Sequence, residues 1–275
     1  MPSLEALFRE RFGETPAEVD ESVAPALRDM AARGSCRHFT DRAVPWPLLE
    51  TLAATAFSAG SKSDLQQRDL VLIRDDAQRE RLAALVPDQA WIAKAPVLAV
   101  VLANNRRQRR LHDLTGHPFA NAHLDALLNA FADAAILLQA FVTAAEAVGL
   151  GICPISAVRN RAREVSDLLA LPDHVIPFAG LGLGWPAFPT PRVSLRLPLT
   201  ATLHVDRFDE GDLDAQLRAY DERRRRLQPM RSQRDPARFG ESDSYGWIED
   251  KARQYATPER ADFGRFCREK GFETD

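Results

Sequence analysis

The feature that most constrains the fold is a long apolar stretch that runs from about Leu124 to Leu150. It is interrupted by side chains that would be costly in lipid, namely Asp125, Asp133, Gln139 and Glu146. We therefore expect a buried helix of a soluble protein over residues 124–148, ended by a cap at Gly149-Leu150-Gly151.

Composition narrows the functional class. The 275 residues have 45% hydrophobic and 27% charged side chains and a net charge of −3, so no basic excess points to nucleic acid. The three cysteines, Cys36, Cys153 and Cys267, form no CxxC pair and no zinc-type spacing, which favours a reducing compartment without a metal site. No signal peptide, repeat or low-complexity linker is evident, so we expect one cytoplasmic domain over residues 1–275.

Helical and strand patterns alternate irregularly along the chain, which favours an α+β fold over a doubly wound sheet. We expect helices at 3–33 (two, broken near 13–16), 45–57, 77–85, 124–148, 158–170 and 212–226, with two short helices closing the chain. Strands are expected at 36–39, 69–74, 95–103, 152–155 and 175–183, with an irregular basic stretch at 106–110. The polar tail after Leu199 has too few apolar residues for its own core, so we expect it to pack on the rest or on another subunit.

The common nucleotide and hydrolase motifs are absent: no P-loop, GxGxxG, GxSxG or HExxH is found. The stretch Arg33-Gly34-Ser35-Cys36-Arg37 instead places two guanidinium groups and a hydroxyl within five residues, which can surround a phosphate. By spacing alone, an Arg-Gly-Ser turn is more often a plain helix stop with solvated arginines. Because the common nucleotide motifs are absent, a redox role would need a flavin site that is not of the Rossmann type.

The sequence resembles the FMN-dependent nitroreductase family, and within it the larger NADPH-preferring, oxygen-insensitive branch. The resemblance rests on five motifs in the family's order: residues 33–40 (RGSCRHFT), 61–66 (SKSDLQ), 144–151 (AAEAVGLG), 183–186 (LGWP) and 194–198 (SLRLP). It implies a three-layer fold with a central mixed, mainly antiparallel sheet between helices. It also implies N-terminal helices in 1–32, a wrapping C-terminal extension in 200–275 and an intertwined homodimer.

The resemblance also implies roles for individual residues. Arg33, Gly34, Ser35 and Arg196 would hold the FMN phosphate. Arg37 would stabilise charge at the flavin N1/O2 edge, and Ser61, Ser63, Gln66 and Gln89 would approach the ribityl chain or the pyrimidine ring. Backbone groups of Pro154, Ile155, Ser156 and Ala157 would lie against the ring, with one N–H directed at N5; Arg37, Ser156 and Ala157 are thus the expected catalytic positions.

The arginine-rich tail supplies the candidates for recognising NADPH. Arg231, with Arg234 or Arg238, would contact the 2′-phosphate, and Arg260 would face the flavin and the substrate. Arg223 to Arg226 are interpreted as a solvated helix face, while the basic stretch 106–110 fits either a plain surface loop or the rim of the site.

Two positions depart from the family pattern. The expected Lys-x-Arg element has Ser194 in place of the lysine, so one phosphate cation is missing. The expected Gly-Gly pair is Ser156-Ala157, whose Cβ atoms narrow the space beside the ring.

The implied activity is transfer of hydride from NADPH through FMN to nitroaromatics, quinones or similar acceptors, with ping-pong kinetics. Two alternatives stay open: a flavin reductase that supplies reduced FMN to a partner, and a flavin-binding member with little turnover.

Overall fold

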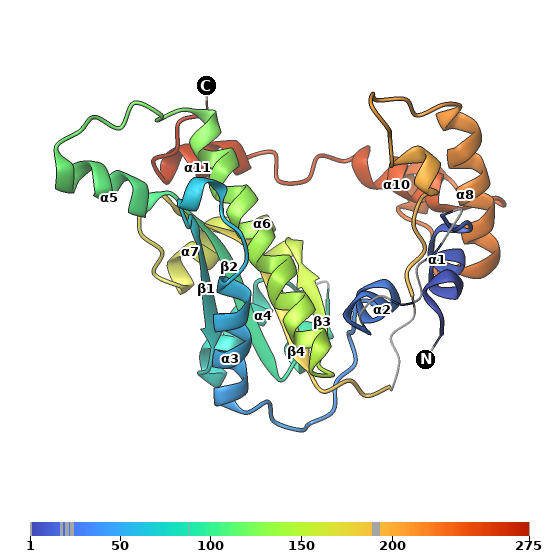
Figure 1. Ribbon diagram of the computed structural model, residues 1–275, viewed down its shortest axis with the longest axis horizontal. Helices are drawn as coiled ribbons and strands as arrows, with labels where there is room; N and C mark the ends of the chain where they lie inside the picture. The colour runs from blue at the N-terminus through green and yellow to red at the C-terminus, as the bar shows by residue number, and fades with distance from the viewer. Residues whose placement is uncertain are drawn as a thin grey trace. The chain divides into compact units, whose positions relative to one another are not determined.

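The computed structural model describes residues 2–16, 19, 22, 25–87, 89–188 and 193–274. They form two compact units (Figure 1). Unit 1 comprises residues 1–34 and 192–259, and unit 2 comprises residues 35–191 and 260–275. The chain therefore passes twice through each unit.

Unit 2 is built on a four-stranded sheet in the order β1(Arg68–Ile73), β2(Val97–Asn104), β4(Val175–Gly184) and β3(Gly151–Ile155). Every pairing among these strands is antiparallel. All eight residues of β2 are buried, because helices cover both faces of the sheet. The expected α+β fold is confirmed.

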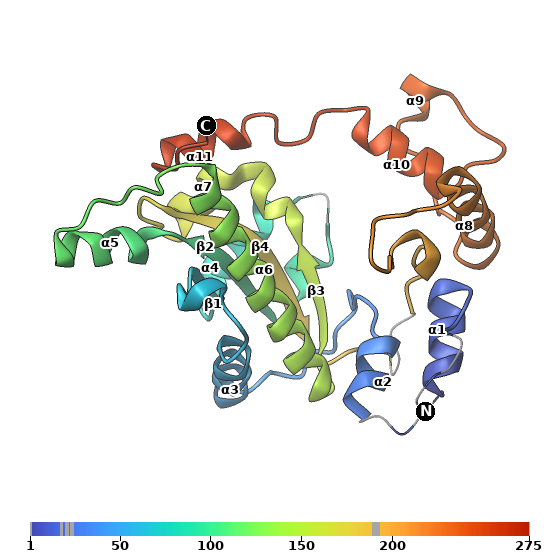
Figure 2. The ribbon, with the colours of Figure 1, turned by 45° about the horizontal axis from the view of Figure 1, so that its top comes forward.

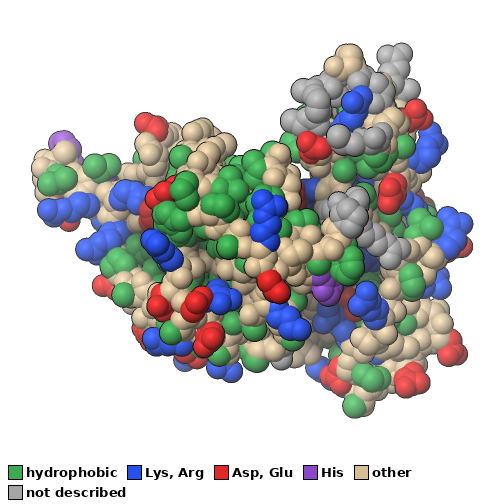
Figure 3. All heavy atoms as spheres, turned by 90° about the horizontal axis from the view of Figure 1, so that it is seen from below, with side chains coloured by type: hydrophobic (Ala, Val, Ile, Leu, Met, Phe, Trp, Pro, Cys, Tyr) green, Lys and Arg blue, Asp and Glu red, His purple; other side chains and the backbone are tan. Residues whose placement is uncertain are grey.

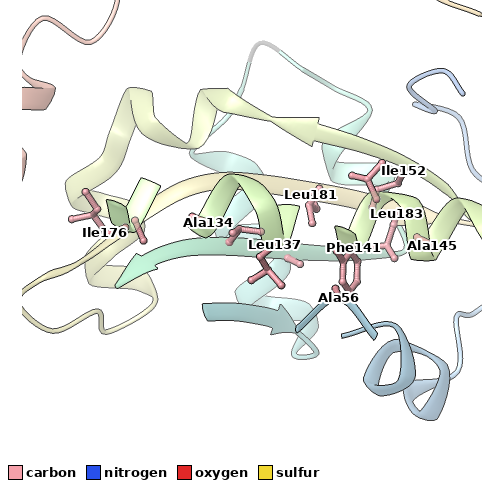
Figure 4. Packing of buried hydrophobic residues seen from close by; sticks show 14 of the residues in the cluster. Ala56, Ala134, Leu137, Phe141, Ala145, Ile152, Ile176, Leu181 and Leu183 are labelled. Atoms are coloured by element: carbon pink, nitrogen blue, oxygen red, sulfur yellow. The ribbon is translucent and has the colours of Figure 1, made fainter. Parts of the chain in front are cut away.

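The side chains of β2 alternate between two hydrophobic clusters, as the two-residue period of a strand requires. Val97, Ala99, Val101 and Ala103 pack with α3(Trp46–Phe57) and α6(Leu124–Ala147) on one face of the sheet (Figures 2 and 4). Leu98, Val100 and Leu102 pack on the other face with residues of α4(Asp76–Ala84) and α7(Ala162–Leu168). The result is a layer of strands between two layers of helices.

The expected central helix is α6, which follows the sheet along its length (Figures 1 and 2). Its length and hydropathy would suit a membrane span, but Phe141, Leu137 and Ala134 on its inner side are fully buried against the sheet. It ends as expected: Gly149 has a left-handed φ of 82°, and the Leu150 N–H donates to the Ala145 carbonyl at 3.0 Å. We therefore assign α6 to the core of unit 2.

The remaining elements of unit 2 are short. They are α5(Arg106–Thr115), α11(Phe263–Glu269) and the 3-10 turns η1(Lys62–Asp64), η2(Ile92–Lys94) and η3(Ser156–Arg161). Unit 1 contains α1(Leu4–Phe12), α2(Pro25–Ala32), η4(Leu199–Ala201), α8(Leu213–Leu227), α9(Pro236–Phe239) and α10(Trp247–Tyr255).

The predictions for two segments were wrong. Residues 36–39 form no strand; Phe39 makes an isolated bridge with Pro186, and the Cys36 N–H donates to the Ile152 carbonyl. The basic stretch 106–110 is not irregular but opens α5, because arginine, glutamine and leucine are good helix formers and Gly116 ends the helix with a φ of 70°. The helix expected at 158–170 also begins earlier, as the 3-10 turn η3.

Candidate functional site

The expected phosphate-binding arginines of unit 1 line one pocket of about 930 Å³. Arg33 is half-buried and directly follows α2, and Arg196 is exposed on the segment that precedes η4. Arg196 donates from Nη1 to the Leu195 carbonyl at 3.0 Å, and its other side-chain nitrogens bond no residue that the structure describes. These two guanidinium groups can therefore meet an anion in the same pocket.

A third arginine, Arg11 at the end of α1, fixes the backbone of both segments. Its guanidinium donates to the carbonyls of Arg33 at 2.6 Å and Ser194 at 3.0 Å, and to Ala31 at 2.9 Å. Its own carbonyl accepts from the Arg196 N–H at 2.7 Å. Only 7% of Arg11 is exposed, so it acts as an internal brace.

The sequence contained a signal for Arg11 that was missed. Leu4, Leu7 and Arg11 follow the three- and four-residue spacing of one helix face, and all three are buried. A charged residue on an apolar face must satisfy its donors inside the protein.

In unit 2, Ser35 is half-buried and Arg37 is exposed. Between them the Cys36 thiol is buried, and burial raises its pKa in spite of the nearby His38 carbonyl and the Arg37 charge. A neutral, buried thiol is consistent with the expectation that Cys36 is not redox active.

The loop that carries Ser61, Ser63 and Gln66 has an unusual backbone. Ser63, Asp64 and Gln66 all have positive φ, at 50°, 56° and 52°. Such conformations persist in non-glycine residues only where the surroundings impose them. The Gln66 side chain donates to Asp64 at 3.0 Å.

Two buried charges impose the conformation of this loop. Asp133 of α6 accepts from the Ser61 hydroxyl and from the N–H groups of Lys62 and Gln67, at 2.8 to 3.0 Å. Arg68 donates to the carbonyls of Phe57, Ala59 and Gly60. The Ser61 hydroxyl also accepts from the Gln66 N–H at 2.7 Å, so it is engaged within the loop.

The segment expected beside the flavin ring follows β3. Pro154 and Ser156 are exposed, Ile155 is buried, and Ala157 is half-buried. Ser156 and Ala157 begin η3, and the first N–H groups of a helical turn have no partner within the turn. Gln89 lies on a different segment, where its side-chain oxygen accepts from the Trp91 indole at 3.2 Å.

The expected NADPH residues divide between the units. In unit 1, Arg231 is exposed, Arg234 pairs with Asp250 at 3.0 Å, and Arg238 donates to Thr257 at 2.8 Å. In unit 2, Arg260 has a φ of 56° and donates to Asn160 at 2.7 Å. Each of the latter three is thus already held by at least one protein group.

The arginine run on α8 is only partly a solvated face. Arg225 and Arg226 are exposed, as expected. Arg223 is half-buried and caps the end of α1 by donating to the carbonyls of Arg9 and Arg11 at 3.1 and 3.3 Å. Arg224 is half-buried and lines the same pocket as Arg33 and Arg196.

On the face seen in Figure 3, Lys and Arg side chains are interspersed with Asp and Glu and form no continuous basic patch. No cluster of potential metal ligands occurs among the described residues.

Comparison with known proteins gives a consistent picture. Residues 30–185 match the model of the nitroreductase family, and residues 194–275 match its C-terminal domain model. An oxygen-insensitive NADPH nitroreductase of Salmonella typhimurium is 36% identical over 201 residues, which cover 73% of this chain and 81% of the relative. An FMN reductase [NAD(P)H] of Bacillus subtilis is 33% identical over 71% of this chain and 80% of its own.

Solved structures also superpose on most of this chain. The hypothetical oxidoreductase YcnD from Bacillus subtilis superposes with a TM-score of 0.82 at 26% identity, covering 92% of this chain and all of that one. The NADPH:FMN oxidoreductase from Vibrio harveyi, complexed with NAD+, superposes with a TM-score of 0.75 at 25% identity over 90% of this chain and 97% of that one.

Proposed function

The chain belongs to the nitroreductase family of FMN-dependent, NAD(P)H-consuming oxidoreductases, and from this we propose that it reduces nitroaromatics, quinones or similar acceptors at the expense of NADPH. When bound, FMN would supply the two-electron chemistry of hydride transfer. The observation that carries the proposal is the brace formed by Arg11, which presents Arg33 and Arg196 to one pocket.

The donor set of this pocket fits a phosphate monoester. Arginine offers paired N–H groups that match phosphate oxygens, and two arginines approach the charge of nearly −2 that such a group carries. We propose that Arg33, Gly34, Ser35 and Arg196 hold the FMN phosphate. The exposed Arg196 guanidinium has donors to spare for it.

The ring-side residues would act by electrostatics and positioning. We propose that the exposed Arg37 stabilises negative charge at the N1/O2 edge, and that the N–H groups of Ser156 and Ala157 face N5. Ser61, Ser63, Gln66 and Gln89 would contact the ribityl chain or the pyrimidine ring, with Ser61 contributing mainly by shaping the loop through its bond to Asp133. Backbone atoms of Pro154 and Ile155 complete the ring site.

The reductant and the acceptor would use the same place in turn, which gives ping-pong kinetics. We propose that Arg231 and Arg234 select NADPH through its 2′-phosphate and that Arg260 faces the ring and the substrate. Arg234 would either leave its ion pair with Asp250 or bind the 2′-phosphate in addition to that ion pair.

We propose that the enzyme is a cytoplasmic homodimer. The α6 side chains Leu124, Leu128 and Ile136 recur on one side of the helix and are 40–55% exposed, although the opposite side forms the core of unit 2. An apolar helix face of this kind suits a subunit interface. Light scattering of the purified protein measures the assembly, and a monomer at micromolar concentration would contradict it.

A second candidate is a flavin reductase, because relatives from Bacillus subtilis and Vibrio harveyi carry that activity in their names. The two functions separate in steady-state kinetics. A nitroreductase turns over a nitroaromatic without added flavin, whereas a flavin reductase shows saturable NADPH oxidation that depends on free FMN.

Three measurements test the proposal. The purified protein is expected to be yellow, to bleach anaerobically with NADPH faster than with NADH, and to lose FMN in the Arg196→Ala variant without loss of fold. A colourless protein that takes up no FMN would overturn it. Retention of flavin by Arg196→Ala would remove Arg196 from the site.

A further inference from the structure

One face of α8 lies along the segment that carries Ser194 and Arg196. The Tyr220 hydroxyl donates to the Leu195 carbonyl at 3.3 Å, and the Gln228 side chain donates to the Val193 carbonyl at 2.7 Å. Arg224 lies one helical turn after Tyr220 on α8, and Gln228 directly follows the last residue of the helix. Arg224 therefore lies in sequence between the two residues that contact this segment.

The Arg224 side chain has N–H donors that no described residue accepts. It lines the pocket together with Arg33 and Arg196, and its only hydrogen bond to a described residue is from Nη1 to the neutral Tyr220 hydroxyl, at 3.4 Å. Its Nε is buried and has no partner in the described part of the chain. A cationic group in this state is costly unless an anion completes it.

Two other cations of the pocket, Lys251 and Arg11, do not share this property. Lys251 pairs with Asp250 at 2.7 Å, and the Arg11 guanidinium is used on backbone carbonyls. Within the described residues, no acidic side chain forms an ion pair with Arg224. Arg224 is therefore an arginine of α8 without an acidic partner among the described residues, and it lines the same pocket as Arg33 and Arg196.

We propose that Arg224 is a third cation for the FMN phosphate and supplies from α8 the charge that Ser194 does not supply from its own segment. This inference rests on the proposed FMN site. The full charge of a phosphate monoester is nearly −2, so a third arginine adds a charge-assisted hydrogen bond to a group that two arginines only just neutralise.

The test compares FMN with riboflavin, which has the same ring and ribityl chain but no phosphate. Apoprotein of the full chain is titrated with each flavin, and binding is followed by quenching of flavin fluorescence. Arg224→Ala is expected to weaken FMN binding by about tenfold to a hundredfold, as for loss of one charge-assisted hydrogen bond, and to leave riboflavin binding unchanged. Arg226→Ala, which removes an exposed arginine from the same helix, is the matched control.

The outcomes separate this inference from the proposed site. If Arg196→Ala loses FMN but Arg224→Ala binds it as well as Arg226→Ala does, Arg224 has no such role and the site stands. If neither loses FMN, the proposed site is wrong as well. Equal weakening of FMN and riboflavin would show a structural role for Arg224, and a raised KM for NADPH with unchanged FMN affinity would assign its charge to the 2′-phosphate instead; either result overturns the inference.

A rescue completes the test. Ser194 precedes Arg196 by two positions on the segment that α8 contacts at Val193 and Leu195, so Ser194→Lys in the Arg224→Ala background is expected to restore most of the FMN affinity. Circular dichroism and the midpoint of urea unfolding confirm that each variant is folded. A folded double variant without recovery would contradict the proposed equivalence of the two positions.

Discussion

The carboxylate of Asp133, in the middle of α6, accepts a hydrogen bond from the Ser61 hydroxyl at 3.0 Å across 72 positions of the chain. Asp133 is fully buried, and its second oxygen accepts from the Lys62 N–H at 2.8 Å. The central helix of the core therefore also determines the backbone of the loop proposed to meet the cofactor.

Asp133→Asn is expected to destabilise unit 2. The carboxylate faces only donors, so the amide NH₂ of asparagine meets a donor whichever way it is turned. The cost of a buried unpaired donor is about 1–3 kcal/mol in the free energy of unfolding. Urea unfolding measures it, with Asp125→Asn, an exposed change on the same helix, as the control; equal midpoints for the two variants would refute the role of Asp133.

Arg11→Lys is expected to weaken both the fold of unit 1 and FMN binding, although the charge is retained. A single ammonium cannot span the three carbonyls of Ala31, Arg33 and Ser194 that the guanidinium bridges. We expect a loss of about 2 kcal/mol in the free energy of unfolding, from broken charge-assisted hydrogen bonds.

Arg9→Lys is the control for Arg11→Lys, because Arg9 forms an exposed ion pair with Glu5, of a kind that contributes little. Unfolding midpoints and FMN affinity are measured for both. Arg11→Lys that matches Arg9→Lys in both measurements would show that the brace is dispensable.

Gly151→Ala is expected to disturb the start of β3. A Cβ at this position would lie 2.5 Å from the Cys36 sulphur and 2.7 Å from the Cys36 Cβ. Overpacking of this kind costs about 1–3 kcal/mol. Gly60→Ala, where nothing lies within 4 Å of the added Cβ, is the control. Thermal unfolding compares the two, and an unchanged midpoint for Gly151→Ala would mean that the Cys36 segment is not held against β3.

Unit 1 is expected to lose stability in acid through Asp250. Burial acts to raise the pKa of this carboxyl, but hydrogen bonds from Lys251 and Tyr245 and the charge of Arg234 outweigh burial and lower it. The pKa in the folded state is thus below that in the unfolded chain, so the unfolded chain binds the proton more readily. The contribution to stability is complete above the unfolded value of about 4 and is lost as the pH falls through the folded value.

The measurement for Asp250 is the free energy of unfolding between pH 6 and pH 3. Asp250→Asn is expected to be less stable at pH 6 and to show a flatter dependence below pH 4. Asp243→Asn, an exposed change in the same unit, should keep the wild-type slope. Parallel curves for the wild type and Asp250→Asn would exclude this carboxyl as a source of the acid sensitivity.

The sequence was sufficient for elements whose periodicity is strong, and insufficient where long-range contacts decide. The apolar runs that became α6, β2 and β4 were predicted almost to their ends, because burial on one or both faces leaves a direct pattern. Residues 36–39 have the composition of a strand but lack a continuous partner.

The candidate site shows the same division. Arg33 and Arg196 were expected together, and they line one pocket. The groups that hold them and the loop in place, Arg11 and Asp133, were not assigned a role, because their partners lie up to 183 positions away. A charged residue inside an apolar helix pattern indicates that it has a buried partner, but the pattern does not identify that partner.

The C-terminal segment has a consequence for biosynthesis. Phe266, Cys267 and Phe272 complete the hydrophobic cluster between the sheet and α6, but the ribosome makes them after every residue of unit 1. Until these last residues leave the ribosome, the apolar interior of unit 2 is incomplete and open to solvent and to other nascent chains. A product truncated between residues 260 and 272 would lack side chains that close the core of unit 2 and would expose an aggregation-prone apolar surface.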